Sequence, residues 1–228
     1  MRRKLIAEFL GTFALVFAGT GAIVIDQVSH GAVTHVGIAL TFGLIVLAMI
    51  YTLGDISGAH INPAVTIAFS VARRFPCKDV FPYVAAQSVG AITASLTLRL
   101  LFPQNVALGA TLPAESSLQS FILEFILTAL LMFVILGVST GAREKGITAG
   151  IAIGSVIALD ALFAGPICGA SVNPARSLAP ALVSLQLQSL WIYLVAPTLG
   201  AVAGVYVCCL VREPGCCSVA DAFEAPMP

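Results

Sequence analysis

The stretch Ser57–Val65 reads SGAHINPAV, and Gly169–Ser177 follows a similar pattern, GASVNPARS, in the second half of the chain. Both contain Asn-Pro-Ala after a run of mostly small residues; the two copies are Asn62, Pro63, Ala64 and Asn173, Pro174, Ala175. Asn is a preferred helix N-cap, and proline is tolerated in the first turn of a helix. Each copy therefore predicts that a helix begins there, with Asn at its mouth.

The segments after the two motifs predict only short helices, over 65–72 and 177–184. A helix needs about 20 residues to cross the hydrocarbon core of a membrane, so neither can span it. A short helix at membrane depth must be buried in protein or line a cavity, because lipid cannot satisfy its free backbone groups. Two such half-helices, one in each half of the chain, indicate a binding or conduction site near the midplane.

The composition places the rest of the chain in a membrane. Of the 228 residues, 59% are hydrophobic and 10% are charged, and the mean hydropathy is +1.02. Soluble domains carry about 25% charged residues, so an integral membrane protein is expected. The formal net charge is zero, and no basic patch indicates a nucleic-acid partner. No metal or other cofactor is expected.

Six apolar segments of roughly 20 residues fit membrane spans. They are Leu5–Ile25, Ala32–Leu53, Phe81–Phe102, Leu118–Val138, Ile147–Gly165 and Leu190–Val211. The predicted fold class is therefore an all-α membrane protein with six transmembrane helices and two re-entrant half-helices. We expect one domain over 1–212 and a disordered cytoplasmic tail over 213–228.

The two halves of the domain, about 1–102 and 117–212, are repeats. Residues 7–12, AEFLGT, return as LEFILT at residues 123–128, so Glu8 corresponds to Glu124. Three spans per repeat is an odd number, which predicts that the second repeat is inverted in the membrane. Of the eleven Lys and Arg residues, only Arg99 and Arg176 fall away from one side of the six-span arrangement. By the positive-inside rule, both termini are predicted to be cytoplasmic, in a multi-pass protein of the plasma membrane.

The paired Asn-Pro-Ala motifs, the Glu motif in the first and fourth spans, and Arg176 after the second motif resemble the aquaporins, or major intrinsic proteins. The resemblance covers about residues 4–211. Within the family the chain looks bacterial, with some likeness to the plant nodulin-like intrinsic proteins at 58–60 and 162–167. The resemblance implies a right-handed six-helix bundle, a pore in each protomer and a homotetramer.

The motif positions assign roles in such a pore. Asn62 and Asn173 cap the half-helices, and their side-chain amides can also donate hydrogen bonds to a passing water or hydroxyl oxygen. The positive ends of the two half-helices raise the cost of a cation or proton there. A charge at membrane depth is by default functional. The resemblance implies that Arg176 is part of an outer constriction, where it donates hydrogen bonds to the passing molecule and repels cations.

The resemblance places Phe42, Ala161 and Ala170 beside Arg176 as the other three corners of this selectivity filter. Water-selective members usually carry His where this chain has Ala161, so a wider filter is expected, which admits glycerol, urea or undissociated metalloid hydroxides. Two residues disagree about the subclass. Ser177 resembles the water-selective class, since glycerol channels usually carry Asp at this position. Leu194 departs from the water-selective class, which usually has Trp there.

Four further ionisable residues lie in the predicted membrane region. Glu8 and Glu124 are expected to support the re-entrant loops by accepting backbone hydrogen bonds, because buried charges need such partners. For His60 a structural role at the cytoplasmic mouth is favoured over a gating role. For Asp160 a structural hydrogen bond is favoured over a position facing the pore, where it would influence selectivity. Cys168 would confer mercury sensitivity only if it faces the pore, since the position usually sensitive in the family is Ala170 here.

The prediction is therefore a passive channel for water and small neutral solutes that excludes protons and ions. Its alternatives are a water-selective aquaporin, a secondary transporter coupled to ions, and a structural protein of the same fold with a blocked pore. A transporter would need acids for coupling, and the available ones have structural interpretations. An enzyme is not expected, because no catalytic set of Ser, His and Asp falls in the membrane core.

Overall fold

The computed structural model describes residues 1–139 and 143–212 of the chain, and the predicted disordered tail over 213–228 lies outside them. This described part contains helices and no strand. Within these residues, six helices are long and apolar enough to cross a membrane. They are α1 (Arg2–Val28), α2 (Thr34–Ser57), α4 (Cys77–Leu101), α5 (Ser117–Ser139), α6 (Arg143–Cys168) and α8 (Leu190–Val211). The prediction of six spans is confirmed.

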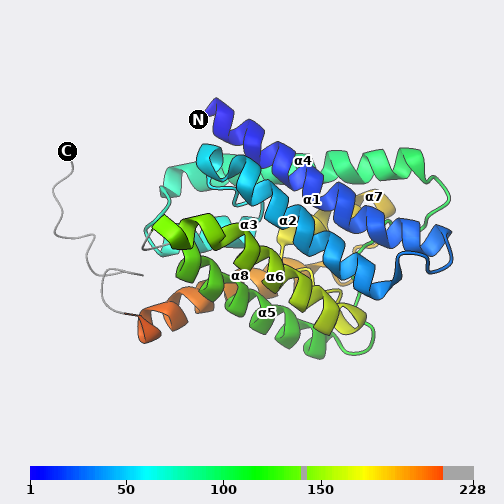
Figure 1. Cartoon of the computed structure of the whole chain (residues 1–228). Coiled ribbons are helices and arrows are strands. Elements are labelled where there is room, and N and C mark those ends of the chain that lie inside the picture. Colours follow the sequence, from blue (N-terminus) through cyan, green and yellow to red (C-terminus); the bar gives the residue numbers. More distant parts are fainter. Residues whose placement is uncertain (140–142, 213–228) are drawn as a thin grey trace.

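Two short helices interrupt this series, one in each half of the chain. They are α3 (Pro63–Val71) and α7 (Pro174–Ser184), and each begins at the proline of its Asn-Pro-Ala motif. Both lie within the bundle of long helices, α3 toward one end and α7 toward the other (Figure 1). The chain is thus an all-α membrane protein with six spans and two re-entrant half-helices.

The ends of several spans differ from the prediction. Helix α1 is longer at both ends, α2 runs to Ser57 rather than to Leu53, and two further helices are extended at an end that contains a proline. Helix α4 begins at Cys77 rather than at Phe81, so that Pro82 lies inside it. Helix α6 continues past Gly165 to Cys168 and contains Pro166. A proline removes one helical hydrogen bond but ends a helix only where packing does not hold the flanking turns. Sequence therefore underestimates the length of both spans.

The two halves use the same close helix contact. Helix α1 packs on α4, and the equivalent α5 packs on α8, while α2 packs on α6 and joins the halves. A Cβ placed on Gly90 would clash with the carbonyl oxygen of Phe9, and one placed on Gly200 would clash with that of Phe125. Phe9 and Phe125 each follow the Glu of the repeated motif. Only glycine permits this approach of the two helices.

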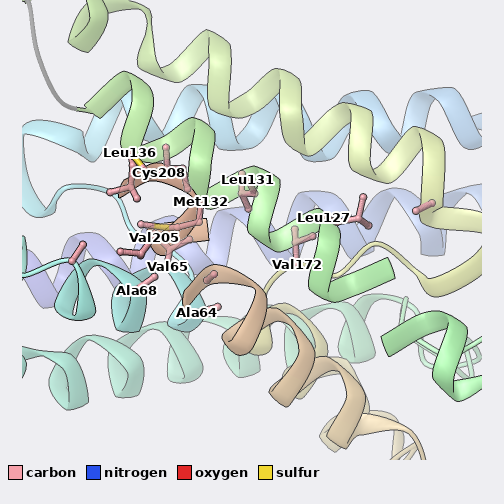
Figure 2. Close-up of a cluster of buried hydrophobic side chains, with 14 of the residues drawn as sticks. Ala64, Val65, Ala68, Leu127, Leu131, Met132, Leu136, Val172, Val205 and Cys208 are labelled. Carbon is pink, nitrogen blue, oxygen red and sulfur yellow. The ribbon is translucent and has the colours of Figure 1, made fainter. Parts of the chain in front are cut away.

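A buried apolar cluster holds α3 in place. It contains Ala64, Val65 and Ala68 of α3, which pack against residues of α5 and α8 such as Met132 and Val205 (Figure 2). Val172, from the loop before α7, belongs to the same cluster. The core therefore extends from the second half of the chain to the half-helix of the first half, and it includes the loop before α7.

Candidate functional site

Both Asn side chains cap the half-helix that follows them. The Oδ1 atom of Asn62 accepts a hydrogen bond from the Ala64 N–H at 2.9 Å. The Oδ1 atom of Asn173 accepts from the N–H groups of Ala175 at 3.0 Å and Arg176 at 3.3 Å. These bonds satisfy backbone donors that the helix itself leaves unpaired. The partially positive ends of α3 and α7 are thereby fixed at the two Asn residues.

The same side chains connect the two halves through their amide nitrogens. Asn62 Nδ2 donates to the Val172 carbonyl at 2.7 Å, and Asn173 Nδ2 donates to the Ile61 carbonyl at 2.9 Å. Each Asn therefore binds the backbone of the residue just before the other Asn. An amide nitrogen carries two hydrogens, so one N–H of each remains for a further acceptor.

The two carbonyl-bearing residues have an uncommon backbone conformation. Ile61 has a φ of +42° and Val172 a φ of +46°, which is a genuine outlier for β-branched residues. Their N–H groups donate to Glu8 Oε2 at 2.7 Å and to Glu124 Oε2 at 2.8 Å. Each strained residue is thus held at its N–H by a glutamate of its own half and at its carbonyl by an Asn of the other half.

Glu8 and Glu124 make the contacts that a loop-supporting role requires, but in unequal number. Glu8 is fully buried and accepts four hydrogen bonds. Its donors are the Ser57 hydroxyl, the backbone N–H groups of His60 and Ile61, and the Gln87 amide. Glu124 accepts from the N–H groups of Ser171 at 2.7 Å and Val172 at 2.8 Å. Each glutamate thus accepts two backbone N–H bonds from its re-entrant loop, and Glu8 also binds side chains of α2 and α4.

His60 packs in an aromatic cluster at the mouth nearer the N-terminus. Its ring stacks on Phe69 with 4.8 Å between centroids and lies close to Phe75 and Tyr83. The Nδ1 atom lies 3.2 Å from the Thr66 hydroxyl. This packing is that of a structural residue, although His60 also lines the cavity described next.

One cavity of about 410 Å³ runs past both Asn-Pro-Ala motifs. One group of its lining residues is apolar: Leu15, Phe42, Val46, Ile50, Val65, Leu131, Ile135, Ile153 and Ile157. The other group comes from the two re-entrant loops, 58–62 and 170–173. The polar side chains in the lining include the two Asn amides, Asp55, His60 and Arg176, set against an apolar background. Such a lining orients a small polar molecule through few hydrogen bonds.

All four residues of the predicted filter line this cavity: Phe42, Ala161, Ala170 and Arg176. Arg176 is 2% exposed, and its Nη1 donates to the Gly109 carbonyl at 2.8 Å. Its guanidinium carbon lies 5.1 Å from the centre of the Phe42 ring, within the range of a cation–π contact. Arg176 Nε is buried and has no hydrogen-bond partner within the described part of the chain.

Three other residues that the sequence singled out lie away from this lining. Ser177 is fully buried and bonds to the hydroxyls of Thr111 and Ser171. Cys168 is also fully buried, and its thiol lies 3.5 Å from the Ala164 carbonyl. Asp160 is 6% exposed, and its Oδ2 has no partner among the described residues. The expected structural hydrogen bond of Asp160 is therefore absent at that oxygen, because no donor of the described part reaches it.

Sequence reasoning missed the partners that hold these residues. Gln87 Nε2 donates to Glu8 at 2.7 Å and to Thr66 at 2.9 Å from the middle of α4. Gly109 and Thr111 come from the connection between α4 and α5. A polar Gln within an apolar span was the one available signal for Gln87. Gly109 contributes a backbone carbonyl, which no pattern of side chains could indicate.

Comparison with known proteins gives consistent results. The family model "Major intrinsic protein" matches residues 1–208. Aquaporin NIP1-1 of Oryza sativa subsp. japonica is 51% identical over 211 residues, which are 92% of this chain and 74% of that protein. Nodulin-26 of Glycine max is 50% identical over 211 residues, 92% of this chain and 78% of that protein.

A solved structure supports the fold independently. The aquaglyceroporin from Plasmodium falciparum matches with a TM-score of 0.81 and 29% sequence identity. The match covers 89% of this chain and 93% of that one. The expected likeness to plant nodulin-like proteins is confirmed, whereas the likeness to bacterial members stays a prediction.

Proposed function

The chain belongs to the major intrinsic protein family, and on that premise we propose that its cavity is a passive pore for water and for small neutral solutes such as glycerol, urea and undissociated metalloid hydroxides. The protein is a channel and not an enzyme. The filter consists of Phe42, Ala161, Ala170 and Arg176. The pore centre consists of Asn62 and Asn173, with their prolines and alanines.

The small side chains at two of the four filter positions carry the proposal. Ala161 and Ala170 both line the cavity, so the constriction is bounded by two methyl groups, the Phe42 ring and the Arg176 guanidinium. Such a filter offers hydrogen-bond donors with an apolar surface, which suits a solute with hydroxyl groups on a carbon chain. The similar solved structure is itself named an aquaglyceroporin.

The contrary signal at Ser177 has a local explanation. Ser177 is fully buried among Thr111 and Ser171 and is not part of the described cavity lining. The residue type at position 177 therefore affects how the loops pack, and it does not directly change the width of the filter. The alternative of a water-selective channel rests on this residue alone.

The exclusion of cations and protons follows from fixed positive charge along the passage. Arg176 contributes a full charge, and each half-helix contributes about half a positive charge at its N-terminus. The free N–H of Asn62 and that of Asn173 offer donors to one oxygen at the centre, which interrupts a continuous chain of hydrogen-bonded water. A cation or proton therefore meets an electrostatic barrier that a neutral solute does not.

The proposed setting is the plasma membrane, with both termini in the cytoplasm and four copies forming a homotetramer. Basic residues gather on the side of the N-terminus: Arg2, Arg3 and Lys4 at the start of α1, Arg73 and Arg74 after α3, and Lys78 in the first turn of α4. This asymmetry supports a cytoplasmic N-terminus by the positive-inside rule. The tetramer is inferred from the family. Glu8, Glu124 and His60 support the loops from within each protomer.

The decisive experiment measures stopped-flow flux of water and glycerol in proteoliposomes. The wild type is expected to conduct both. Ala161→His should lower glycerol flux by about tenfold or more, or about 1.4 kcal/mol of barrier, while water flux persists. Ala161→Ser is the matched control, because it adds a polar atom without the width of the imidazole ring. Fast water flux without glycerol flux in the wild type would establish the water-selective alternative instead.

A further inference from the structure

Arg99 is one of the two basic residues that lie away from the positive side of the chain, and its side chain holds a loop. It stands in the last turn of α4. Its Nη1 donates to the Asn105 carbonyl at 2.7 Å and lies 3.4 Å from the Pro103 carbonyl. Both acceptors belong to the connection 102–116 between α4 and α5, called the outer loop below. A charge-assisted bond of this kind is stronger than one between neutral groups.

Asn105 joins three parts of the structure at this point. It is 8% exposed, and its Nδ2 donates to Gln27 Oε1 at 2.8 Å in the last turn of α1. Its Oδ1 accepts from the Leu108 N–H at 2.8 Å. With the bond from Arg99 to its carbonyl, Asn105 thus connects the ends of α1 and α4 to the backbone of the outer loop. Buried polar side chains that form hydrogen bonds at both donor and acceptor atoms give a well-defined local structure.

The next residues press the loop onto α1. Leu108 has a φ of +51° and is fully buried with Val24 and Leu98. Gly109 has a φ of +70°, and a Cβ there would lie 2.9 Å from Thr20 Cβ. A side chain at this position is excluded by space and by backbone conformation together. The turn so formed presents the Gly109 carbonyl to Arg176 Nη1.

Beyond Gly109 the outer loop is attached to the second half of the chain. The Thr111 hydroxyl donates to the Ser177 hydroxyl at 2.8 Å, and the Ala114 N–H donates to the Ile167 carbonyl at 2.9 Å. The Gly109 carbonyl therefore lies between two anchored segments. One is anchored on α1 and α4, and the other on the segment from α6 to α7. These two anchored segments together set the position of the Gly109 carbonyl relative to the cavity.

We propose that Arg99, Asn105 and Gln27 are positioning residues for Arg176, and thereby determine how freely solutes larger than water pass. The proposal rests on the proposed function, because Arg176 is the residue assigned there to the filter. With the loop anchored, Gly109 holds the guanidinium against the wall of the cavity. Without the anchors the guanidinium loses its acceptor and moves into the passage. A solute of the size of glycerol is then obstructed more than water is.

The test compares the ratio of glycerol to water permeability in proteoliposomes between loop variants. Asn105→Leu removes both side-chain bonds at similar volume, and the ratio is expected to fall by about threefold or more, the effect of about one net hydrogen bond. Gln27→Leu changes an exposed residue at a helix end and should lower the ratio in the same direction. Gln27→Glu keeps an acceptor for Asn105 and should restore the wild-type ratio.

A merely structural role predicts a different pattern. Loss of folded protein would lower water and glycerol flux together and leave their ratio unchanged. Val106→Ala is the matched control, since Val106 lies in the same loop, is 75% exposed and should keep the wild-type ratio. An unchanged ratio in folded Gln27→Leu and Asn105→Leu would overturn the proposal.

Failure of the proposed function has its own signature, which is a wild type that conducts no glycerol. In that case the anchors are tested by water flux per folded channel. Gln27→Leu should then conduct less water than the wild type, and Gln27→Glu should match the wild type. Equal water flux in all three proteins would overturn the positioning role even though the filter assignment had already failed.

Discussion

Asn62 and Asn173 each donate one amide hydrogen to the backbone carbonyl that precedes the other, across the boundary between the two halves of the chain. Each is at the same time the N-cap of its own half-helix. One side chain thus ends a loop, begins a helix and connects two repeats. The motif is informative because proline and alanine support the helix start, while only an amide supplies an acceptor for the cap and donors for the other loop.

Separating these two tasks gives the first prediction. Asn62→Ser keeps a good capping residue but leaves the buried Val172 carbonyl without its donor, which should cost about 1–3 kcal/mol. Asn62→Ala should cost about 1 kcal/mol more, because the cap is also lost. Thermal unfolding in detergent measures both. A serine variant as stable as the wild type would mean that the bond across the halves contributes little.

The glutamates should differ in their tolerance of an amide. In Glu8→Gln the new NH₂ group must face two of the four donors that now bind the carboxylate, whichever way it turns. In Glu124→Gln it faces one of two. Either variant leaves one backbone N–H unpaired, at about 1–3 kcal/mol. Glu8→Gln must in addition reorient the Ser57 hydroxyl or the Gln87 amide, so it should be the less stable variant. The midpoints of thermal unfolding of the two purified proteins show which variant is less stable. A less stable Glu124→Gln would contradict the hydrogen bonds described for the two glutamates.

Mercury should not act through Cys168. This thiol is fully buried and lies outside the described lining of the cavity, whereas Ala170 is part of that lining. We therefore expect Cys168→Ser to leave the response of water flux to mercury unchanged. Ala170→Cys should create a block that a reducing thiol reverses. If the wild type is blocked and Cys168→Ser removes the block, the assignment of Cys168 to the protein interior is wrong.

The contact between α5 and α8 predicts a cost for a single methyl group. In Gly200→Ala the Cβ would clash with the Phe125 carbonyl oxygen, so the helices must separate or the protein must fail to fold. Gly54→Ala is the matched control, because a Cβ there meets no atom within 4 Å. In a helix interior that exchange should stabilise by about 0.5–1 kcal/mol. Folded yield and melting temperature are the measurements, and equal behaviour of the two variants would contradict the tight contact.

The sequence predicts most of the framework for identifiable reasons. Apolar runs predict the spans, and the two Asn-Pro-Ala motifs predict where α3 and α7 begin. The repeat of Glu8 as Glu124 indicates that the halves are equivalent. These are local patterns, which depend on residues close together in the chain. The family resemblance adds the filter positions, all of which line one cavity.

What the sequence does not predict depends on contacts between distant segments. The acceptors of the Asn amides are backbone carbonyls more than a hundred residues away, at Val172 and Ile61. The acceptor for Arg176 is a carbonyl in an irregular loop. Backbone groups have no identity in a sequence, so such partners become visible only when the loops are placed. Helix α4 begins five residues before Pro82, at Cys77, because packing against distant segments outweighs the local preference of the sequence.

The left-handed residues before the two Asn caps have a consequence for how the protein assembles. Ile61 and Val172 keep an unfavourable backbone conformation only while two supports are present, one from each repeat. A nascent chain that has completed only its first repeat can supply the glutamate for Ile61 but not the amide of Asn173. The central part of the pore therefore forms late, as a joint product of both repeats. If the two halves are expressed separately, neither should form a conducting pore until both are present in one membrane.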